Sequence, residues 1–154
     1  MGATREGRLT PAAVSGGRGA ALECLTAGEN SMMFNSFKTH TNFSVDDITR
    51  ARGFYEKTLG LKVQTETPEG LLFKTGGDTC FNVYRKPDHK PADHTVMSFE
   101  VDQIEPVMSE LKQKGITFEK LEMTNDKGIA VQGDQKAAWF KDPAGNWLCL
   151  TELH

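Results

Sequence analysis

The chain has 154 residues, of which 38% are hydrophobic and 25% charged, and its formal net charge is -3. This length suits one domain that buries enough surface to fold without disulfides, and the small negative charge argues against nucleic acid or a membrane as a partner. The three cysteines lack paired spacing, which indicates a reducing compartment and a cytoplasmic location.

Residues 1–36 differ in composition from the rest of the chain. They are rich in glycine, alanine, serine and threonine, and they lack the apolar core of a secretory signal. A segment of this kind buries too little apolar surface to order itself. We therefore expect a disordered N-terminal extension over residues 1–36, followed by a single domain over residues 37–154.

The first half of this domain predicts a strand, a helix and three further strands. In the first strand Phe43 and Val45 fall on one face by alternation. Residues 46–60 predict a helix that is capped by Asp46 and ended by Gly60. Glycine-containing turns separate the later strands. The expected strands are residues 37–45, 61–67, 70–75 and 79–85.

The second half repeats the same pattern after a proline- and charge-rich linker. The stretch "FSVDDI" at Phe43 matches "FEVDQI" at Phe99, each at the end of a strand and the start of a helix. The second helix, residues 102–115, is expected to begin at Asp102, with Glu105 completing a capping box. The expected strands are residues 94–101, 116–123, 130–140 and 147–153.

The chain is thus predicted to be an α+β protein with two tandem β-α-β-β-β modules, module one over 37–86 and module two over 93–153. Each sheet can bury one face under its helix, and the two remaining faces are expected to curl around a shared cleft. Alternation along the strands makes this inner face unusually polar for a core, which favours a ligand-binding cleft. The candidate ligand-binding residues are His40, Asn42, Asn82, Tyr84, Ser98, Trp147 and Cys149.

Three stretches carry a resemblance to a known family. The sequences "HTNFSVDDITRARGFYEKTLGLKV", "FEVDQI" and "WFKDPAGNWLCL" resemble the vicinal oxygen chelate superfamily, which includes glyoxalases, bleomycin resistance proteins and extradiol dioxygenases. The resemblance implies a curled mixed sheet around a cleft, a small-molecule ligand and frequent pairing as homodimers. It also implies four metal positions, which here hold His40, Asn82, Val96 and Cys149. Because valine offers no donor atom, we expect no family-type metal, and His40 is the ligand if one binds.

The functional interpretation keeps two alternatives. The first is a bleomycin-resistance-like protein that binds a small molecule in the inter-module cleft without a metal or other cofactor. The second is a metal-dependent lyase, isomerase or dioxygenase with a non-standard divalent metal site that includes His40. Cys149 is interpreted as a buried, unreactive thiol rather than a nucleophile, because no lysine or arginine neighbour is evident and His40 is the only plausible base on the facing strands. Whether the protein is an enzyme stays open at this point.

Overall fold

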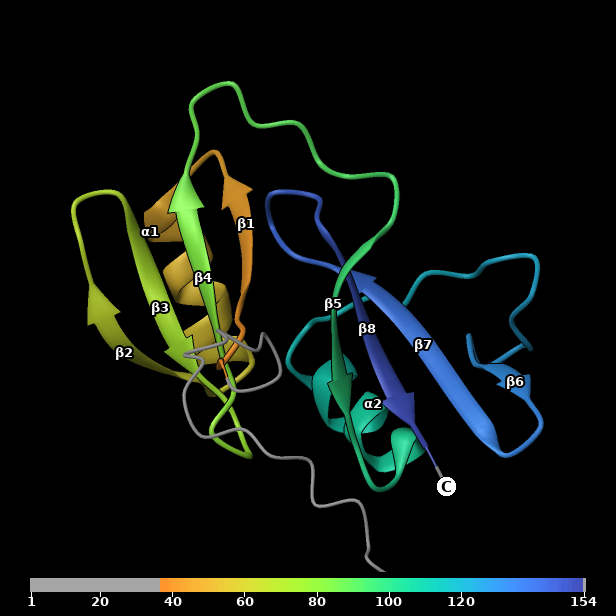
Figure 1. The fold of residues 1–154 in the computed structure, drawn as a ribbon. Coiled ribbons are helices and arrows are strands. Elements are labelled where there is room, and N and C mark those ends of the chain that lie inside the picture. Colours follow the sequence, from red (N-terminus) through yellow and green to blue (C-terminus); the bar gives the residue numbers. More distant parts are fainter. Residues whose placement is uncertain (1–36, 154) are drawn as a thin grey trace, which may run out of the picture. The chain divides into compact units, whose positions relative to one another are not determined.

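Two four-stranded mixed sheets, one from each predicted module, form the framework of the chain (Figure 1). The computed structural model describes residues 37–153, and those from Lys38 onward belong to one compact unit. The disorder expected of residues 1–36 falls outside the described residues. The predicted α+β arrangement of two β-α-β-β-β modules is confirmed within residues 37–153.

The first sheet has the strand order β1-β4-β3-β2. Strands β1 and β4 run parallel, whereas β3 is antiparallel to both β4 and β2. A helix and a π-helical segment, α1 and η2, connect β1 to β2. The elements are β1 Thr41–Val45, α1 Ile48–Arg52, η2 Gly53–Thr58, β2 Lys62–Glu66, β3 Gly70–Lys74 and β4 Cys80–Arg85.

The second sheet repeats this topology with the strand order β5-β8-β7-β6. Strands β5 and β8 are parallel, and β7 is antiparallel to its two neighbours. The elements are β5 Thr95–Glu100, α2 Ile104–Gln113, β6 Ala130–Gln132, β7 Gln135–Lys141 and β8 Trp147–Glu152. In Figure 1, β1 and β5 lie on the inner sides of the two sheets and point in opposite directions.

The first helix begins one residue later than predicted. Asp47, not Asp46, is the N-cap, and its carboxylate accepts hydrogen bonds from the amides of Thr49 and Arg50 at 2.9 and 3.0 Å. Asp46 instead pairs with the Arg50 guanidinium at 2.8 Å. Two adjacent aspartates can both serve as caps by residue type, so composition alone does not distinguish them.

The second helix is capped by a residue that is distant in sequence. The predicted capping box of Asp102 and Glu105 does not form; Gln103 occupies the N-cap without a side-chain bond. The Ile104 amide donates to Oε2 of Glu152 at 2.7 Å, and Glu105 pairs with Lys127 at 2.8 Å. A buried carboxylate on β8 therefore replaces the local cap, because it binds the same helix terminus.

The prediction of a strand over residues 116–123 is wrong. Only Phe118 forms an isolated bridge, with Phe140, and residues beyond it turn. The predicted strand over 130–140 is instead the hairpin of β6 and β7, and Gly133 adopts a positive φ of 59° between them. The second module therefore keeps three strands after its helix, shifted toward the C-terminus.

Each sheet buries one face against its helix. Beneath the first sheet, the rings of Phe43, Phe73 and Phe81 surround Tyr55, and beneath the second, Ile104 and Met108 belong to the same apolar cluster. Burying a side chain of this size contributes roughly 1.5–3 kcal/mol.

None of the described helices is long and apolar enough to cross a membrane. The opposite face of each sheet, called the open face below, is covered by none of the helices in residues 37–153.

Candidate functional site

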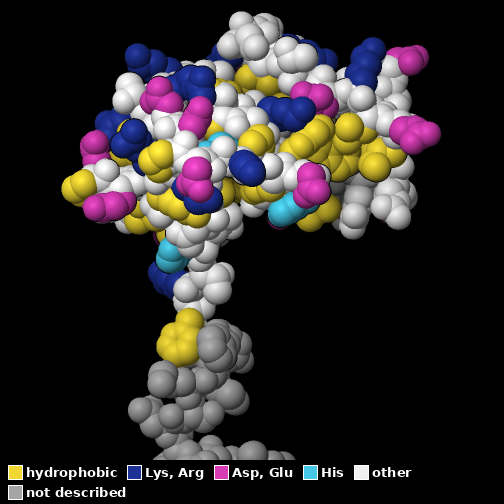
Figure 2. All heavy atoms as spheres, turned by 90° about the horizontal axis from the view of Figure 1, so that it is seen from above, with side chains coloured by type: hydrophobic (Ala, Val, Ile, Leu, Met, Phe, Trp, Pro, Cys, Tyr) yellow, Lys and Arg dark blue, Asp and Glu magenta, His cyan; other side chains and the backbone are white. Residues whose placement is uncertain are grey.

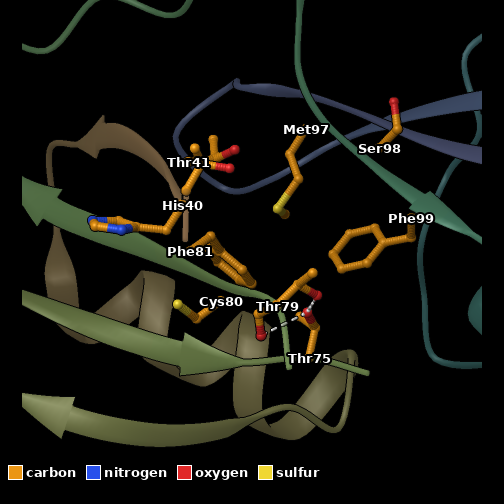
Figure 3. Close-up of a pocket in the computed structure, with 10 residues that line it drawn as sticks. His40, Thr41, Thr75, Thr79, Cys80, Phe81, Met97, Ser98 and Phe99 are labelled. Atoms are coloured by element: carbon orange, nitrogen blue, oxygen red, sulfur yellow. Dashed lines mark hydrogen bonds between the residues drawn. The ribbon is translucent and has the colours of Figure 1, made fainter. Parts of the chain in front are cut away.

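A cavity of about 380 Å³ lies between the two modules, at the start of β1 and beside β5. Three consecutive β5 residues, Met97, Ser98 and Phe99, line it, so it reaches past the edge of the strand to both of its faces. We call it the inter-module cavity. Figure 3 shows its lining residues converging from both modules. They are Thr39, His40, Thr41, Thr75, Thr79, Cys80, Phe81, Met97, Ser98 and Phe99.

The lining combines an apolar wall with a set of hydroxyl groups. The rings of Phe81 and Phe99 meet edge-to-face across the module junction, with centroids 6.5 Å apart and an interplanar angle of 83°. Two threonines, Thr75 and Thr79, are fixed by their own turn: the Thr79 hydroxyl donates to the Gly76 carbonyl at 2.7 Å. The cavity thus offers a rigid apolar surface bordered by hydrogen-bonding groups, which suits an uncharged, partly apolar ligand.

His40 and Ser98 are the two predicted site residues that line this cavity. His40 is exposed and immediately precedes β1, and its ring is directed away from Met97 and Phe99 in Figure 3. Because Thr41 pairs with Phe81, the preceding residues His40 and Cys80 lie side by side. His40 therefore connects the cavity to the open face of the first sheet.

Three further predicted residues lie together on that open face, outside the cavity. Asn42 pairs with Asn82 in the parallel register of β1 and β4, and Ser44 pairs with Tyr84. Tyr84 is 37% exposed. The three side chains continue the row that starts at His40, so a ligand longer than the cavity would reach them.

One residue near this row was missed by sequence reasoning, which placed it in the linker. His89 Nε2 lies 3.1 Å from the Ala144 carbonyl, which only accepts, so Nε2 carries a proton. Its Nδ1 is hydrogen-bonded to the Ser44 hydroxyl at 2.8 Å. His89 joins β1 to the turn before β8, a contact that no local sequence pattern indicates.

The remaining two predicted residues, Cys149 and Trp147, lie on β8. Cys149 pairs in register with Ser98, but it is only 2% exposed. Burial raises the pKa of its thiol to about 11, and hydrogen bonds with the Ala138 backbone and the Ser98 side chain lower it only in part. The thiol is therefore protonated at neutral pH and is a poor nucleophile. Trp147 lies outside the cavity, with Lys141 Nζ 4.1 Å from its ring centroid.

A second indole on the open face of the second sheet was also missed. Trp139 pairs with Cys149 on the neighbouring strand, and its Nε1 donates to the Thr95 hydroxyl at 3.0 Å. It borders a smaller hollow of about 290 Å³ that also involves Thr151 and the exposed Met123. The strand that contains Trp139 was predicted, but the pairing of Trp139 with Cys149 on β8 was not.

A buried polar cluster holds the two modules together beside the site. The Tyr55 hydroxyl donates to Asp142 Oδ2 at 2.9 Å, and the Asn146 side-chain amide donates to the same oxygen at 2.9 Å and to the Ser44 carbonyl at 3.0 Å. Tyr55 and Asp142 are 0% and 4% exposed. Burial, and then the adjacent carboxylate, raises the pKa of Tyr55. The turn "DPAGN" thus serves to fix module two against β1.

Comparison with known proteins connects this architecture to one family. A model of the Glyoxalase/Bleomycin resistance protein/Dioxygenase superfamily matches residues 39–150, which is most of the chain. The chain belongs to this superfamily. The match includes every residue of the inter-module cavity and both sheets apart from the last two residues of β8, and it confirms the resemblance seen in the sequence.

Solved structures share the superfamily fold. A glyoxalase family protein from Enterococcus faecalis is 23% identical, with a TM-score of 0.60 over 78% of this chain and 100% of that one. TnmS3, an antibiotic binding protein from Streptomyces sp. CB03234, is 21% identical, with a TM-score of 0.59 over 77% of this chain and 98% of that one. Lactoylglutathione lyase from Agrobacterium tumefaciens is 20% identical, with a TM-score of 0.56 over 76% and 93%. At these identities the likeness establishes the fold alone.

A search of curated proteins found no match. The superfamily likeness therefore carries no specific substrate to this chain, and the site has to be judged on its own residues.

The superfamily metal can be tested against the four positions that the resemblance implies. His40 offers an imidazole and Asn82 an amide oxygen, whereas Val96 has no donor atom and the Cys149 thiol is held in its protonated form. Within residues 37–153, no group of three or more histidine, cysteine, aspartate or glutamate side chains is placed to bind a metal ion. This donor set does not fit a catalytic divalent metal, which requires at least three protein ligands.

Proposed function

We propose that the protein binds a small, uncharged, partly apolar molecule in the inter-module cavity and does so without the superfamily metal. The observation that carries the proposal is the composition of that cavity. The rings of Phe81 and Phe99 form an apolar wall from both modules, and threonine and serine hydroxyls border it. A ligand that fits would gain apolar contacts from the rings and orientation from the hydroxyls.

The predicted residues take distinct roles in this proposal. His40 and Ser98 border the cavity, and Asn42, Asn82 and Tyr84 contact any part of the ligand that extends over the open face of the first sheet. Cys149 lies beside Ser98 on the neighbouring strand, and Trp147 lies at the start of β8. Support for a binding role also comes from TnmS3, an antibiotic binding protein that shares this fold.

Charge distribution supports a neutral ligand as well. Figure 2 shows lysine and arginine side chains intermixed with aspartate and glutamate over the face it presents, without an extended patch of one sign. Such a surface gives no long-range attraction for a polyanion. We also propose a homodimer, as the family resemblance implies, in the reducing cytoplasm; the free thiols of Cys80 and Cys149 suit that compartment. Sedimentation analysis tests the dimer.

The test is a calorimetric screen of uncharged aromatic and hydroxylated compounds against the wild type and two matched variants. Thr41 is exposed and lines the cavity, so Thr41→Trp fills it without disturbing the core. Thr65 is an equally exposed strand residue on β2, outside the cavity, so Thr65→Trp is the control. We expect Thr41→Trp to weaken binding of any hit at least tenfold and Thr65→Trp to leave it unchanged. Absence of any hit, or equal binding by Thr41→Trp, would contradict the proposal.

A further inference from the structure

The outer edge of β5 presents unpaired backbone groups beside the inter-module cavity. Within residues 37–153, β8 is the ladder partner of β5. The Val101 amide donates to the Thr151 carbonyl at 2.8 Å, so Val101 and, by alternation, Phe99 turn their backbone groups toward β8. Ser98 and Glu100 therefore direct their N–H and C=O groups to the opposite side, where the cavity lies.

The edge of β1 forms the other side of the same gap. The Val45 carbonyl accepts from the Lys86 amide at 2.8 Å, on the β4 side, whereas the Ser44 carbonyl accepts from the Asn146 side chain of module two. By alternation, Asn42 also turns its backbone groups away from β4. The two sheets thus touch at Ser44, and the cavity occupies the other end of β1, at Thr41.

The side chains around this gap differ between its two faces. Phe81, Met97 and Phe99 give one side an apolar surface, while Ser98 belongs to the opposite side of β5. A neighbouring hollow of about 430 Å³ shares Phe99 and Ser98 with the cavity and extends to Glu100. Glu100 is exposed, and among the described ion pairs none involves its carboxylate.

We propose that this gap binds an extended peptide segment of a partner, which adds to the free edge of β5 as a short strand. Main-chain hydrogen bonds to Ser98 and Glu100 supply the pairing, because an unpaired strand edge is a template for an incoming strand. Alternate side chains of the peptide then face opposite ways, one toward the apolar wall and the next toward solvent. A lysine or arginine in the peptide pairs with Glu100. The inference shares with the proposed function only the place of binding, because the peptide starts at the inter-module cavity but extends beyond it to Glu100.

The length of the peptide follows from strand geometry. A strand rises about 3.3 Å per residue, so three to four residues extend roughly 10–13 Å along the β5 edge. The segment that the gap fits is therefore short, with one apolar residue between polar ones and a basic residue at one end. A second copy of the chain, or a small molecule without a peptide backbone, would occupy the same space in a different way, and the experiment separates these cases.

The test uses a fluorescently labelled, amidated tetrapeptide of sequence Thr-Thr-Val-Lys, in which the valine and the lysine face opposite sides, and its analogue N-methylated at the valine and both threonines. The analogue keeps every side chain but cannot donate from those amides. We expect saturable binding of the peptide by anisotropy, and at least tenfold weaker binding of the analogue, because each lost hydrogen bond weakens binding by roughly 2- to 13-fold. Equal binding of the two peptides, or no binding of either, would overturn the inference.

Variants at Ser98 and Glu100 test whether the peptide pairs with the free edge of β5. Ser98→Pro removes the amide that faces the gap without removing a ladder bond, whereas Ser98→Ala keeps that amide. We expect the proline variant to lose binding at least fivefold relative to the alanine variant. Glu100→Gln should remove the preference for lysine over norleucine at the peptide's last position. If Ser98→Pro does not fold, slowed hydrogen exchange of the Ser98 and Glu100 amides in the peptide-bound wild type replaces it; unchanged exchange would overturn the inference.

The outcomes distinguish this inference from the proposed function. If small molecules bind in a manner sensitive to Thr41→Trp while both peptides fail, the peptide inference is wrong and the proposed function stands. If neither class binds, both are wrong. If sedimentation shows a dimer that Ser98→Pro dissociates, the edge is occupied by a second copy, and a partner peptide is excluded.

Discussion

The hydroxyl of Tyr55 donates a hydrogen bond to the carboxylate of Asp142 at 2.9 Å, across 87 residues of sequence. Tyr55 belongs to η2 of module one, and Asp142 begins the turn before β8 of module two. The bond is buried at both ends, and Asn146 extends it to the carbonyl of Ser44. This contact fixes the turn before β8 against β1 at the end of the gap opposite the proposed site.

Removing that hydroxyl should destabilise the protein. Tyr55→Phe leaves Asp142 with one bond fewer in a buried position, so we expect the free energy of unfolding to fall by about 1–3 kcal/mol. Urea denaturation followed by circular dichroism measures it. Tyr84→Phe is the matched control for stability, because Tyr84 is 37% exposed and should change it by under about 0.5 kcal/mol. A loss for Tyr55→Phe no larger than the control would show that the bond does not join the modules.

The buried carboxylate of Glu152 is predicted to stabilise α2 from a distance. It accepts from the Ile104 amide at 2.7 Å and pairs with Lys136 at 2.5 Å. Glu152→Ala leaves the first amide of the helix and a half-buried lysine without this carboxylate, so we expect a loss of about 2–4 kcal/mol in chemical denaturation. Glu122→Ala, at an exposed turn position, is the control and should be nearly neutral. Similar values for the two variants would refute the capping role.

Two glycines should respond oppositely to alanine. At Gly70 a Cβ would approach the Val83 carbonyl oxygen to 2.6 Å, so Gly70→Ala must shift β3 against β4 and should cost about 1–3 kcal/mol. At Gly53 a Cβ meets nothing within 4 Å, and the backbone is helical, so Gly53→Ala should add about 0.5–1 kcal/mol. Thermal denaturation of both variants checks this. Destabilisation by Gly53→Ala, or tolerance of Gly70→Ala, would contradict the packing described for the first module.

Stability is expected to fall at alkaline pH. Burial raises the pKa of Cys149 from its ordinary value of 9.0 to about 11, so the folded state holds this proton more tightly than the unfolded state. The resulting stabilisation is complete below pH 9.0 and is lost as the pH rises through about 11. Tyr55, whose pKa is also raised, acts in the same direction.

The measurement is the urea unfolding free energy between pH 8 and 11. In Cys149→Ala, the free energy of unfolding should fall by roughly 1–3 kcal/mol less over that range than it does in the wild type. Cys80→Ala, at a half-buried position, should keep the wild-type slope. An identical decline in the wild type and Cys149→Ala would mean that this thiol does not contribute.

The repeat and the two sheets could be predicted from the sequence because their signals are local. Alternation at Phe43 and Val45, turn glycines and the matching stretch at Phe99 each depend on neighbouring residues only. The cap of α2 could not be found in this way, since Glu152 reaches Ile104 from another strand. Proximity in space, not spacing in sequence, creates such contacts.

The same difference between local signals and contacts distant in sequence applies to the site. Strand parity indicated which residues share a face, and Asn42, Asn82 and Tyr84 do lie together on β1 and β4. Parity does not show how deep a residue lies or how two sheets approach each other. The sequence therefore did not indicate that Phe81 and Phe99 meet at the junction, nor that the hollow lies at the edges of β1 and β5.

The central claim is metal-independent binding in the inter-module cavity, and a calorimetric titration before and after metal removal tests it most directly. The protein is purified without a chelator or affinity tag, and a hit from the screen is titrated into it, into chelator-treated protein and into His40→Ala. The claim predicts the same dissociation constant with and without chelation, together with less than stoichiometric metal in the purified protein. Binding that disappears on chelation and returns with zinc, nickel, manganese or iron, alongside stoichiometric metal that His40→Ala loses, would contradict it.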